Sequence, residues 1–107
     1  MKLINKKCVS CEGGAPPLTE AQIQEYLPEL KTGWKVLENK KIQKEFVFKG
    51  FAEAIAFVNK VANLAEAENH HPDIHIFYRK VTIELWTHSV NGLSENDFIL
   101  AAKVDNL

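Results

Sequence analysis

The chain has 107 residues, of which 46% are hydrophobic and 25% charged, and its formal net charge at pH 7 is -1. This length suits one domain with a modest core, and the composition argues against a disordered chain. The charge excludes an electrostatic nucleic-acid or anionic-membrane binder, and no apolar run approaches the roughly 20 residues that span a bilayer. The start of the chain lacks the apolar stretch of a secretory signal, so we expect one cytoplasmic domain over residues 1–107.

Residues 1–17 are predicted to form an irregular N-terminal arm, because two glycines and two prolines fall between positions 13 and 17. Cys8 and Cys11 form a CxxC pair within this arm. Zinc would need two further ligands, and a thioredoxin-like role would need a βαβ context that does not follow. A cytoplasmic location also disfavours a lasting disulfide. We therefore expect a structural role, or none, for the pair.

The first and last helices are predicted from capping signals. Thr19 can form a capping box with Gln22, and this helix should end near Leu27 because a proline follows. Ser94 and Asp97 make a similar capping pair at the start of the last helix.

A middle helix is predicted over about residues 51–67 from apolar residues at helical spacing. Phe57 and Leu64 lie beside this stripe and widen it. Glu66 and Glu68 fall in the last turn, where negative charge opposes the helix dipole. This cost is a weak hint that one of the two glutamates has another function. The stripe itself consists of Ala54, Ile55, Val58, Val61, Ala62 and Ala65.

Two hairpins are predicted from alternating apolar and polar residues. Their strands and turns are residues 34–38 and 41–48 around Asn39-Lys40, and residues 74–78 and 81–88 around Arg79-Lys80. In the last strand, the residues that share the face of His88 are Thr82, Glu84 and Trp86.

The predicted order is helix, hairpin, helix, hairpin, helix, or α-β-β-α-β-β-α. Two hairpins can join into one antiparallel sheet of four strands, with the three helices on one face, which is an α+β fold. The uncovered face and the edge strands need protection, so we expect self-association as a homodimer or homotetramer.

All four histidines lie within residues 66–105, and three of them are the candidate functional residues. His70 and His71 are adjacent and precede Pro72, while His88 ends the last predicted strand. We expect this strand to bring His88 back to the pair, so that several imidazoles face one pocket.

Three kinds of chemistry compete for these histidines. A metal site is disfavoured because His71 and His75 lie four apart in extended chain, roughly 13 Å from each other, and no HExxH is present. Nucleophilic catalysis is disfavoured because the chain has no GxSxG pattern. Acid–base chemistry fits better, since imidazoles titrate near pH ~6.5 and two close imidazoles tend to hold one acid and one base. The residues alone leave a structural role for the pair equally open.

The pattern resembles the pterin-4a-carbinolamine dehydratase family, also called 4a-hydroxytetrahydrobiopterin dehydratases. The likeness covers about residues 18–105, and the arm is similar to that of many bacterial and plant members. One departure is Val90, where some members carry cysteine. The motifs that carry the likeness are Glu66, His70-His71-Pro72, Tyr78, Thr87-His88, Gly92-Leu93-Ser94, Asp97 and Ala101, with Gly33-Trp34 and the 46–51 run upstream.

The resemblance implies a hydro-lyase that removes water from a 4a-hydroxytetrahydropterin to give quinonoid dihydropterin, in tetrahydrobiopterin recycling. It implies no metal and no organic cofactor, and a pterin as the small-molecule partner. We expect His70 and His88 to exchange protons with the 4a-hydroxyl and N5, and His71 to orient the pterin or assist.

The family likeness also suggests residues around these histidines. Glu66 would orient an imidazole or lie at the pocket rim, and Asp97 would cap a helix, orient His88, or do both. The expected substrate contacts, besides the histidines, are Trp34, Pro72, Thr87, Ser89 and Val90.

Two other functions stay open at this level. Animal members of the family resemble dimerisation cofactors of a homeodomain transcription factor, a role that would use a helix surface and not the histidines. A pterin-related role in molybdenum-cofactor metabolism is the other alternative.

Overall fold

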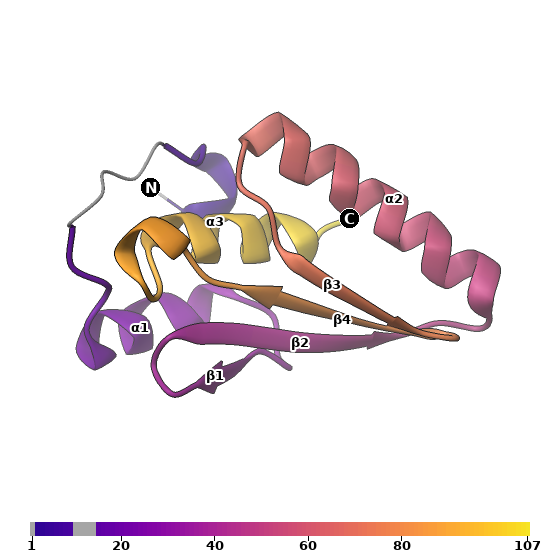
Figure 1. The fold of residues 1–107 in the computed structure, drawn as a ribbon, viewed down its shortest axis with the longest axis horizontal. Helices are drawn as coiled ribbons and strands as arrows, with labels where there is room; N and C mark the ends of the chain where they lie inside the picture. The colour runs from indigo at the N-terminus through magenta and orange to yellow at the C-terminus, as the bar shows by residue number, and fades with distance from the viewer. Residues whose placement is uncertain (1, 10–14) are drawn as a thin grey trace.

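The computed structural model describes residues 2–9 and 15–107, and it confirms the predicted α+β fold and element order (Figure 1). Cys11, the second cysteine of the CxxC pair, lies outside the described residues. The elements are α1 (Glu20–Tyr26), β1 (Lys35–Leu37), β2 (Lys41–Val47), α2 (Phe51–Glu68), β3 (Asp73–Phe77), β4 (Lys80–Leu85) and α3 (Glu95–Val104), with one-turn 3-10 helices η1 (Leu3–Asn5), η2 (Leu27–Glu29) and η3 (His88–Val90).

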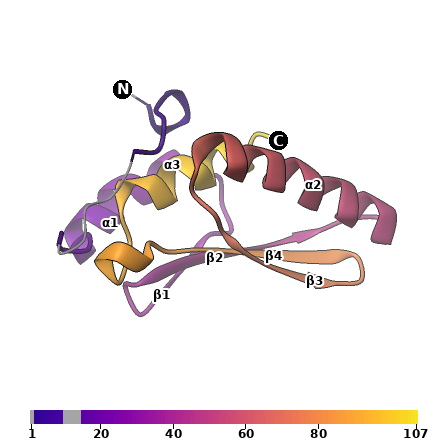
Figure 2. The ribbon, with the colours of Figure 1, turned by 45° about the horizontal axis from the view of Figure 1, so that its top comes forward.

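The four strands form one antiparallel sheet in the order β1-β2-β4-β3, and the three helices cover one face of it (Figure 2). Alternate residues of β4 turn toward the helices, as the sequence pattern predicts, while the opposite face of the sheet stays uncovered. The sheet residues that are completely buried in the core are Ile42, Val81, Ile83 and Leu85.

Both predicted helix starts are confirmed. The Thr19 side chain accepts a hydrogen bond from the Gln22 N–H, which completes a capping box at α1. At α3 the Ser94 N–H donates to Asp97 Oδ2 at 2.9 Å. Both pairs satisfy backbone groups that a helix end leaves without partners.

Both predicted turns are wrong by one residue. In the first hairpin, Glu38 and Asn39 have positive φ angles of 53° and 57°, and the Lys40 N–H closes the turn onto the Leu37 carbonyl. In the second hairpin, Tyr78 has a φ of 55°. The left-handed conformation that tight hairpin turns require fixes the register, and alternation alone does not reveal it.

The last strand is also shorter than predicted. β4 ends at Leu85, and His88 begins η3 instead of ending the strand. The chain bends there because Thr87 and Gly92 pair across a short loop, with the Thr87 N–H donating to the Gly92 carbonyl at 2.7 Å.

The buried stripe of α2 is rotated relative to the predicted one. Phe57, which was expected beside the stripe, is buried and lies against Phe46 and Phe48 with ring centroids 4.7 and 5.0 Å away. Ala62, which was expected within the stripe, is exposed. The large ring takes the space over the sheet because it buries more apolar area than an alanine does.

None of the helices in residues 2–9 and 15–107 combines the length and apolar character needed to cross a bilayer.

The core should depend strongly on Phe98, which is completely buried in α3 and stacks on Tyr26 with ring centroids 5.3 Å apart. Phe98→Ala should lower the free energy of unfolding by about 3–5 kcal/mol, because it leaves a cavity. Phe51→Ala is the matched control, since Phe51 is 53% exposed at the start of α2 and its loss should cost much less than the loss of Phe98. Urea denaturation followed by circular dichroism measures both. Similar losses would show that this core description is wrong.

Candidate active site

The predicted histidines meet at one pocket of about 410 Å³. It forms where the connection from α2 to β3 passes the loop that follows β4. The residues that line it are Asn69, His70, His71, Pro72, Asp73, Trp86, Thr87, His88 and Ser89.

A larger hollow of about 520 Å³ lies between η1, η2 and the end of α3. Its only carboxylate, Glu29, already accepts a hydrogen bond from the Leu3 N–H at 2.9 Å. It contains no histidine. The histidine pocket is therefore the better candidate for acid–base chemistry, although it is the smaller of the two.

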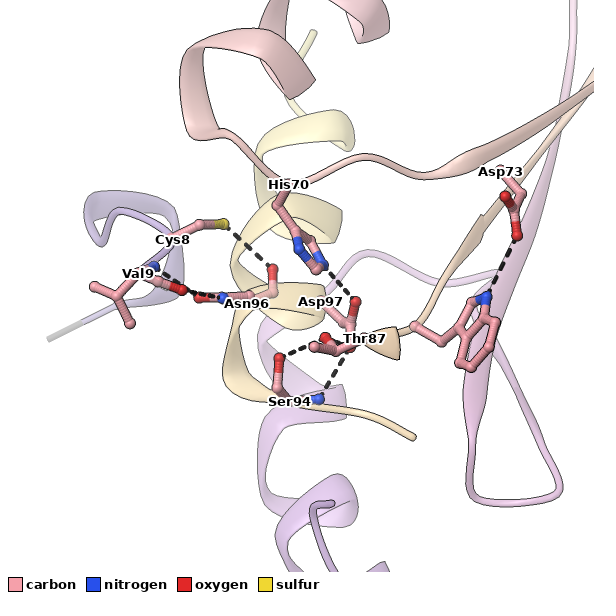
Figure 3. A network of polar contacts seen from close by, with 9 residues as sticks. Cys8, Val9, His70, Asp73, Thr87, Ser94, Asn96 and Asp97 are labelled. Atoms are coloured by element: carbon pink, nitrogen blue, oxygen red, sulfur yellow. Dashed lines mark hydrogen bonds and ion pairs between the residues drawn. The ribbon is translucent and has the colours of Figure 1, made fainter. Parts of the chain in front are cut away.

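Asp97 is the centre of the polar network beside this pocket (Figure 3). Its side chain is completely buried, and Oδ1 lies 2.7 Å from His70 Nε2. Oδ2 accepts from the Thr87 hydroxyl at 2.8 Å and from the Ser94 N–H at 2.9 Å. A buried carboxylate must have such donors, because burial without them would cost several kcal/mol.

This arrangement selects one tautomer of the neutral His70 imidazole. A neutral imidazole donates through one nitrogen and accepts through the other. Since the carboxylate of Asp97 accepts from Nε2–H, the imidazole's acceptor is Nδ1. The side chain of His70 is 13% exposed, so the ring is largely held within the protein.

Local backbone geometry places His70 and Thr87 on either side of this network. Asn69 ends α2 in the left-handed conformation, with a φ of 52°, and the His70 N–H then donates to the Ala65 carbonyl. On the other side, Gly92 pairs with Thr87, and its lack of a side chain lets Pro17 pack against this loop, because a Cβ at Gly92 would lie 2.7 Å from Pro17 Cβ.

His71 forms a separate and more exposed pair with Glu66. His71 Nε2 lies 2.5 Å from Glu66 Oε2, and the two side chains are 55% and 77% exposed. Pairs this exposed contribute little to stability, so the contact orients the imidazole more than it supports the fold.

His88 is held by an aromatic contact. The Trp86 and His88 rings lie with centroids 3.8 Å apart and an interplanar angle of 35°. The indole N–H of Trp86 donates to Asp73 Oδ2 at 3.4 Å, and the Lys41 ammonium lies over the same indole, 5.1 Å from its centroid. Both partners fix the position of the indole, which in turn limits how the imidazole can rotate.

Lys41 is itself held in place by Glu84. Burial alone raises the pKa of Glu84, but hydrogen bonds from Lys41 and Gln43 outweigh it and lower the pKa below its ordinary value of 4.5. Glu84 therefore stays charged at neutral pH and keeps the ammonium beside the indole.

The structure brings most of the sequence-predicted residues to this pocket. His70, His71, Pro72, Thr87, His88 and Ser89 all line it. Asp97 was expected to cap a helix, to orient His88, or to do both. It caps the start of α3, and the histidine that it contacts is His70.

Two expected substrate contacts do not line the pocket. Trp34 donates its indole N–H to Asp105 at 3.0 Å and packs edge-on against Phe46, as a structural tryptophan does. Val90 is only 7% exposed and belongs to the core.

Sequence reasoning missed three lining residues, Asn69, Asp73 and Trp86. Two signals could have identified them. Asn69 and Asp73 flank the His-His-Pro motif, and strand alternation already puts Trp86 on the same face as His88.

No group of three or more histidine, cysteine, aspartate or glutamate side chains in the described part of the chain is arranged to hold a metal ion. The pocket instead offers imidazoles that are each paired with a carboxylate or an indole. Such groups can hold and transfer protons.

Comparison with known proteins shows the family of this chain. Residues 16–107 match the family model described as pterin 4 alpha carbinolamine dehydratase. The chain belongs to this family. The match includes every residue that lines the histidine pocket, together with Asp97.

Relatives in several bacteria are provisionally named pterin-4-alpha-carbinolamine dehydratase. One from Rickettsia canadensis is 47% identical over 104 residues, which cover 97% of this chain and 95% of the relative. One from Legionella pneumophila is 48% identical over 106 residues, which cover 98% of this chain and 94% of the relative.

Solved structures of family members share the fold. A transcriptional coactivator/pterin dehydratase from Brucella melitensis is 36% identical, with a TM-score of 0.78 over 84% of this chain and 96% of its own. A pterin dehydratase-like protein, described as a RuBisCO assembly factor in the alpha-carboxysome, is 28% identical, with a TM-score of 0.60 over 69% of this chain and 87% of its own.

The Asp97 network should contribute measurably to stability. Thr87→Val keeps the shape of the side chain but removes one donor to Asp97, and should lower the free energy of unfolding by about 1.5–3 kcal/mol. Thr82→Val, within β4, is the matched control, and should change the free energy of unfolding by less than about 0.5 kcal/mol. Chemical denaturation at pH 7 distinguishes them, and equal values would contradict the network's importance.

Proposed function

We propose that this protein dehydrates 4a-hydroxytetrahydropterins to quinonoid dihydropterins by histidine acid–base catalysis, within tetrahydrobiopterin recycling. The observation that carries the proposal is the meeting of three histidines at one pocket, with His70 bound to a buried carboxylate. Membership of the dehydratase family gives the substrate class.

The reaction needs two proton transfers and no net oxidation. The C4a–O bond breaks and the hydroxyl leaves as water after it gains a proton. N5 loses its proton as the C4a=N5 double bond forms. A positioned acid and a positioned base each contribute roughly 10²–10⁴-fold to such a reaction.

His70 is suited to take a proton at Nδ1. Its Nε2–H is donated to Asp97, and a buried carboxylate stabilises the imidazolium that forms when the ring gains a proton. His70 would act as the base toward N5, and His88, held against Trp86, would protonate the leaving hydroxyl.

The remaining lining residues would bind the pterin. His71, oriented by Glu66, would contact the ring or assist in proton transfer. Pro72 and the backbone at Thr87 and Ser89 would form the walls, since they line the same pocket.

We also propose self-association. Apolar side chains are exposed along the free edge and the uncovered face of the sheet, where a second copy could cover them. These are Val47, Ile76, Phe77 and Tyr78, which are 55%, 40%, 64% and 69% exposed.

The names of two structural neighbours include coactivator and assembly-factor roles. Such roles depend on a surface and not on paired imidazoles. The contacts around His70 and His88 favour the dehydratase function for this chain.

Stopped-flow measurement of 4a-hydroxytetrahydropterin dehydration tests the proposal. His70→Ala and His88→Ala should each lower turnover by at least about 10²-fold, because each removes one proton-transfer group. His75→Ala, an exposed residue of β3, is the matched control and should retain full activity. Circular dichroism should show that all three variants keep the fold. Unchanged turnover in both the His70 and the His88 variant would refute the assignment.

A further inference from the structure

The N-terminal residues 6–9, called here the arm segment, lie against the two elements that carry the His70–Asp97 pair. They follow η1, whose Leu3 is 1% exposed and anchors the arm in the core. Figure 3 shows Cys8 and Val9 beside Asn96, on the far side of His70 from Asp73.

The first set of contacts joins the arm segment to the start of α3. The Val9 N–H donates to Asn96 Oδ1 at 3.0 Å, and Asn96 Nδ2 donates to the Val9 carbonyl at 2.5 Å. The Cys8 thiol donates to the Asn96 carbonyl at 3.5 Å. Asn96 is 5% exposed and directly precedes Asp97, so this contact fixes the backbone that carries the carboxylate.

A second contact joins the arm segment to the end of α2. The Cys8 N–H donates to Glu68 Oε1 at 2.9 Å, while Lys103 of α3 donates to Glu68 Oε2 at 2.7 Å. Burial alone raises the pKa of Glu68, but the hydrogen bonds from Lys103 and Cys8 outweigh it and lower the pKa below its ordinary value of 4.5. Glu68 is therefore charged at neutral pH and accepts from both donors. This is the other function that the sequence hinted at for a glutamate in the last turn of α2.

Cys8 acts in this contact as a neutral group. Burial, together with the charge of Glu68, raises the pKa of its thiol to about 12. A thiol that stays protonated is a donor and not a nucleophile or metal ligand. A structural role, or none, was expected for the cysteine pair, and Cys8 has a structural one.

Cys8 thus bridges two segments that are distant in the sequence. Glu68 lies two residues before His70, and Asn96 lies one residue before Asp97. The 2.7 Å contact between His70 and Asp97 requires the end of α2 and the start of α3 to keep a fixed spacing. A displacement of about 1 Å at such a pair can cost about 10²-fold in rate.

We propose that the arm segment is a positioning element of the active site, which holds His70 and Asp97 in contact by joining the end of α2 to the start of α3. The inference rests on the proposed function, in which this pair transfers a proton. It adds a role for a segment that lies outside the matched family region, which begins at residue 16.

The test variant is Asn96→Ala, which removes both Val9 hydrogen bonds without touching the pocket. Asn106→Ala is the matched control, because the Asn106 side chain also donates to a backbone carbonyl, that of Ala102, at the opposite end of α3. Two readouts are compared at a temperature where circular dichroism shows each variant folded. They are the exchange of the His70 Nε2–H with water, by ¹H–¹⁵N NMR of the imidazoles, and the steady-state kcat and KM of dehydration.

We expect Asn96→Ala to speed exchange of this proton by about 10-fold and to lower kcat by about 10-fold, with KM changed by less than about threefold. Asn106→Ala should match the wild type in both readouts. If Asn96→Ala does not fold, Cys8→Ala removes only the thiol that donates to the Asn96 carbonyl, and should change both readouts in the same direction by a smaller factor.

Wild-type exchange in Asn96→Ala, or in Cys8→Ala where it replaces that variant, would overturn the proposal. Equal changes in the Asn96 and Asn106 variants would also overturn it. The NMR readout does not depend on catalysis. If the wild-type protein does not dehydrate pterins but Asn96→Ala still speeds exchange, the proposed function fails while the positioning role stands.

Discussion

The buried carboxylate of Asp97 is the constraint on which the rest of the site depends. It has no access to solvent, and it accepts hydrogen bonds from His70, Thr87 and Ser94. These three donors come from the end of α2, the end of the sheet and the start of α3. One side chain thus joins three elements, and removing any donor would leave part of a buried charge without a partner.

Helix α3 carries a second buried carboxylate at its other end, and this explains the position of Trp34. The side chain of Asp105 is 1% exposed and accepts from Lys44 at 2.7 Å, from the Trp34 indole at 3.0 Å and from the Lys31 N–H at 2.9 Å. Removing one partner of such a buried ion pair would leave an uncompensated charge. We therefore regard α3 as fixed at both ends. Asp97 fixes its start beside the pocket, and Asp105 fixes its end against Lys44 of β2.

The sequence predicted the features that depend on local chemistry. Capping residues located the starts of α1 and α3, and alternation identified the buried face of β4, because both patterns act over a few residues. The hairpin turns were displaced by one residue, since Glu38 and Tyr78 adopt left-handed conformations that these residue types rarely adopt. Phe57 replaced Ala62 in the core because the rotation of a helix over a sheet depends on packing across the whole interface.

The site was predicted only in part, for a similar reason. Motif spacing and family likeness indicated the histidines, but spacing does not reveal which carboxylate reaches which imidazole. Asp97 contacts His70, across 27 positions of sequence, and not the nearer His88. Trp34 was expected at the pocket but contacts the end of α3, while Trp86, for which no role was expected, lines the pocket.

The most direct test of this account is the dehydration rate of Asp97→Asn under single-turnover conditions. Asparagine keeps an oxygen for the Ser94 N–H and the Thr87 hydroxyl, but presents its amide N–H₂ to His70 Nε2. The imidazole must then accept at Nε2 and carry its proton on Nδ1, which can no longer serve as the base. We predict a rate lower by about 10²–10⁴-fold in a folded protein. A rate within about threefold of the wild type would contradict the claim that Asp97 prepares His70 for proton transfer.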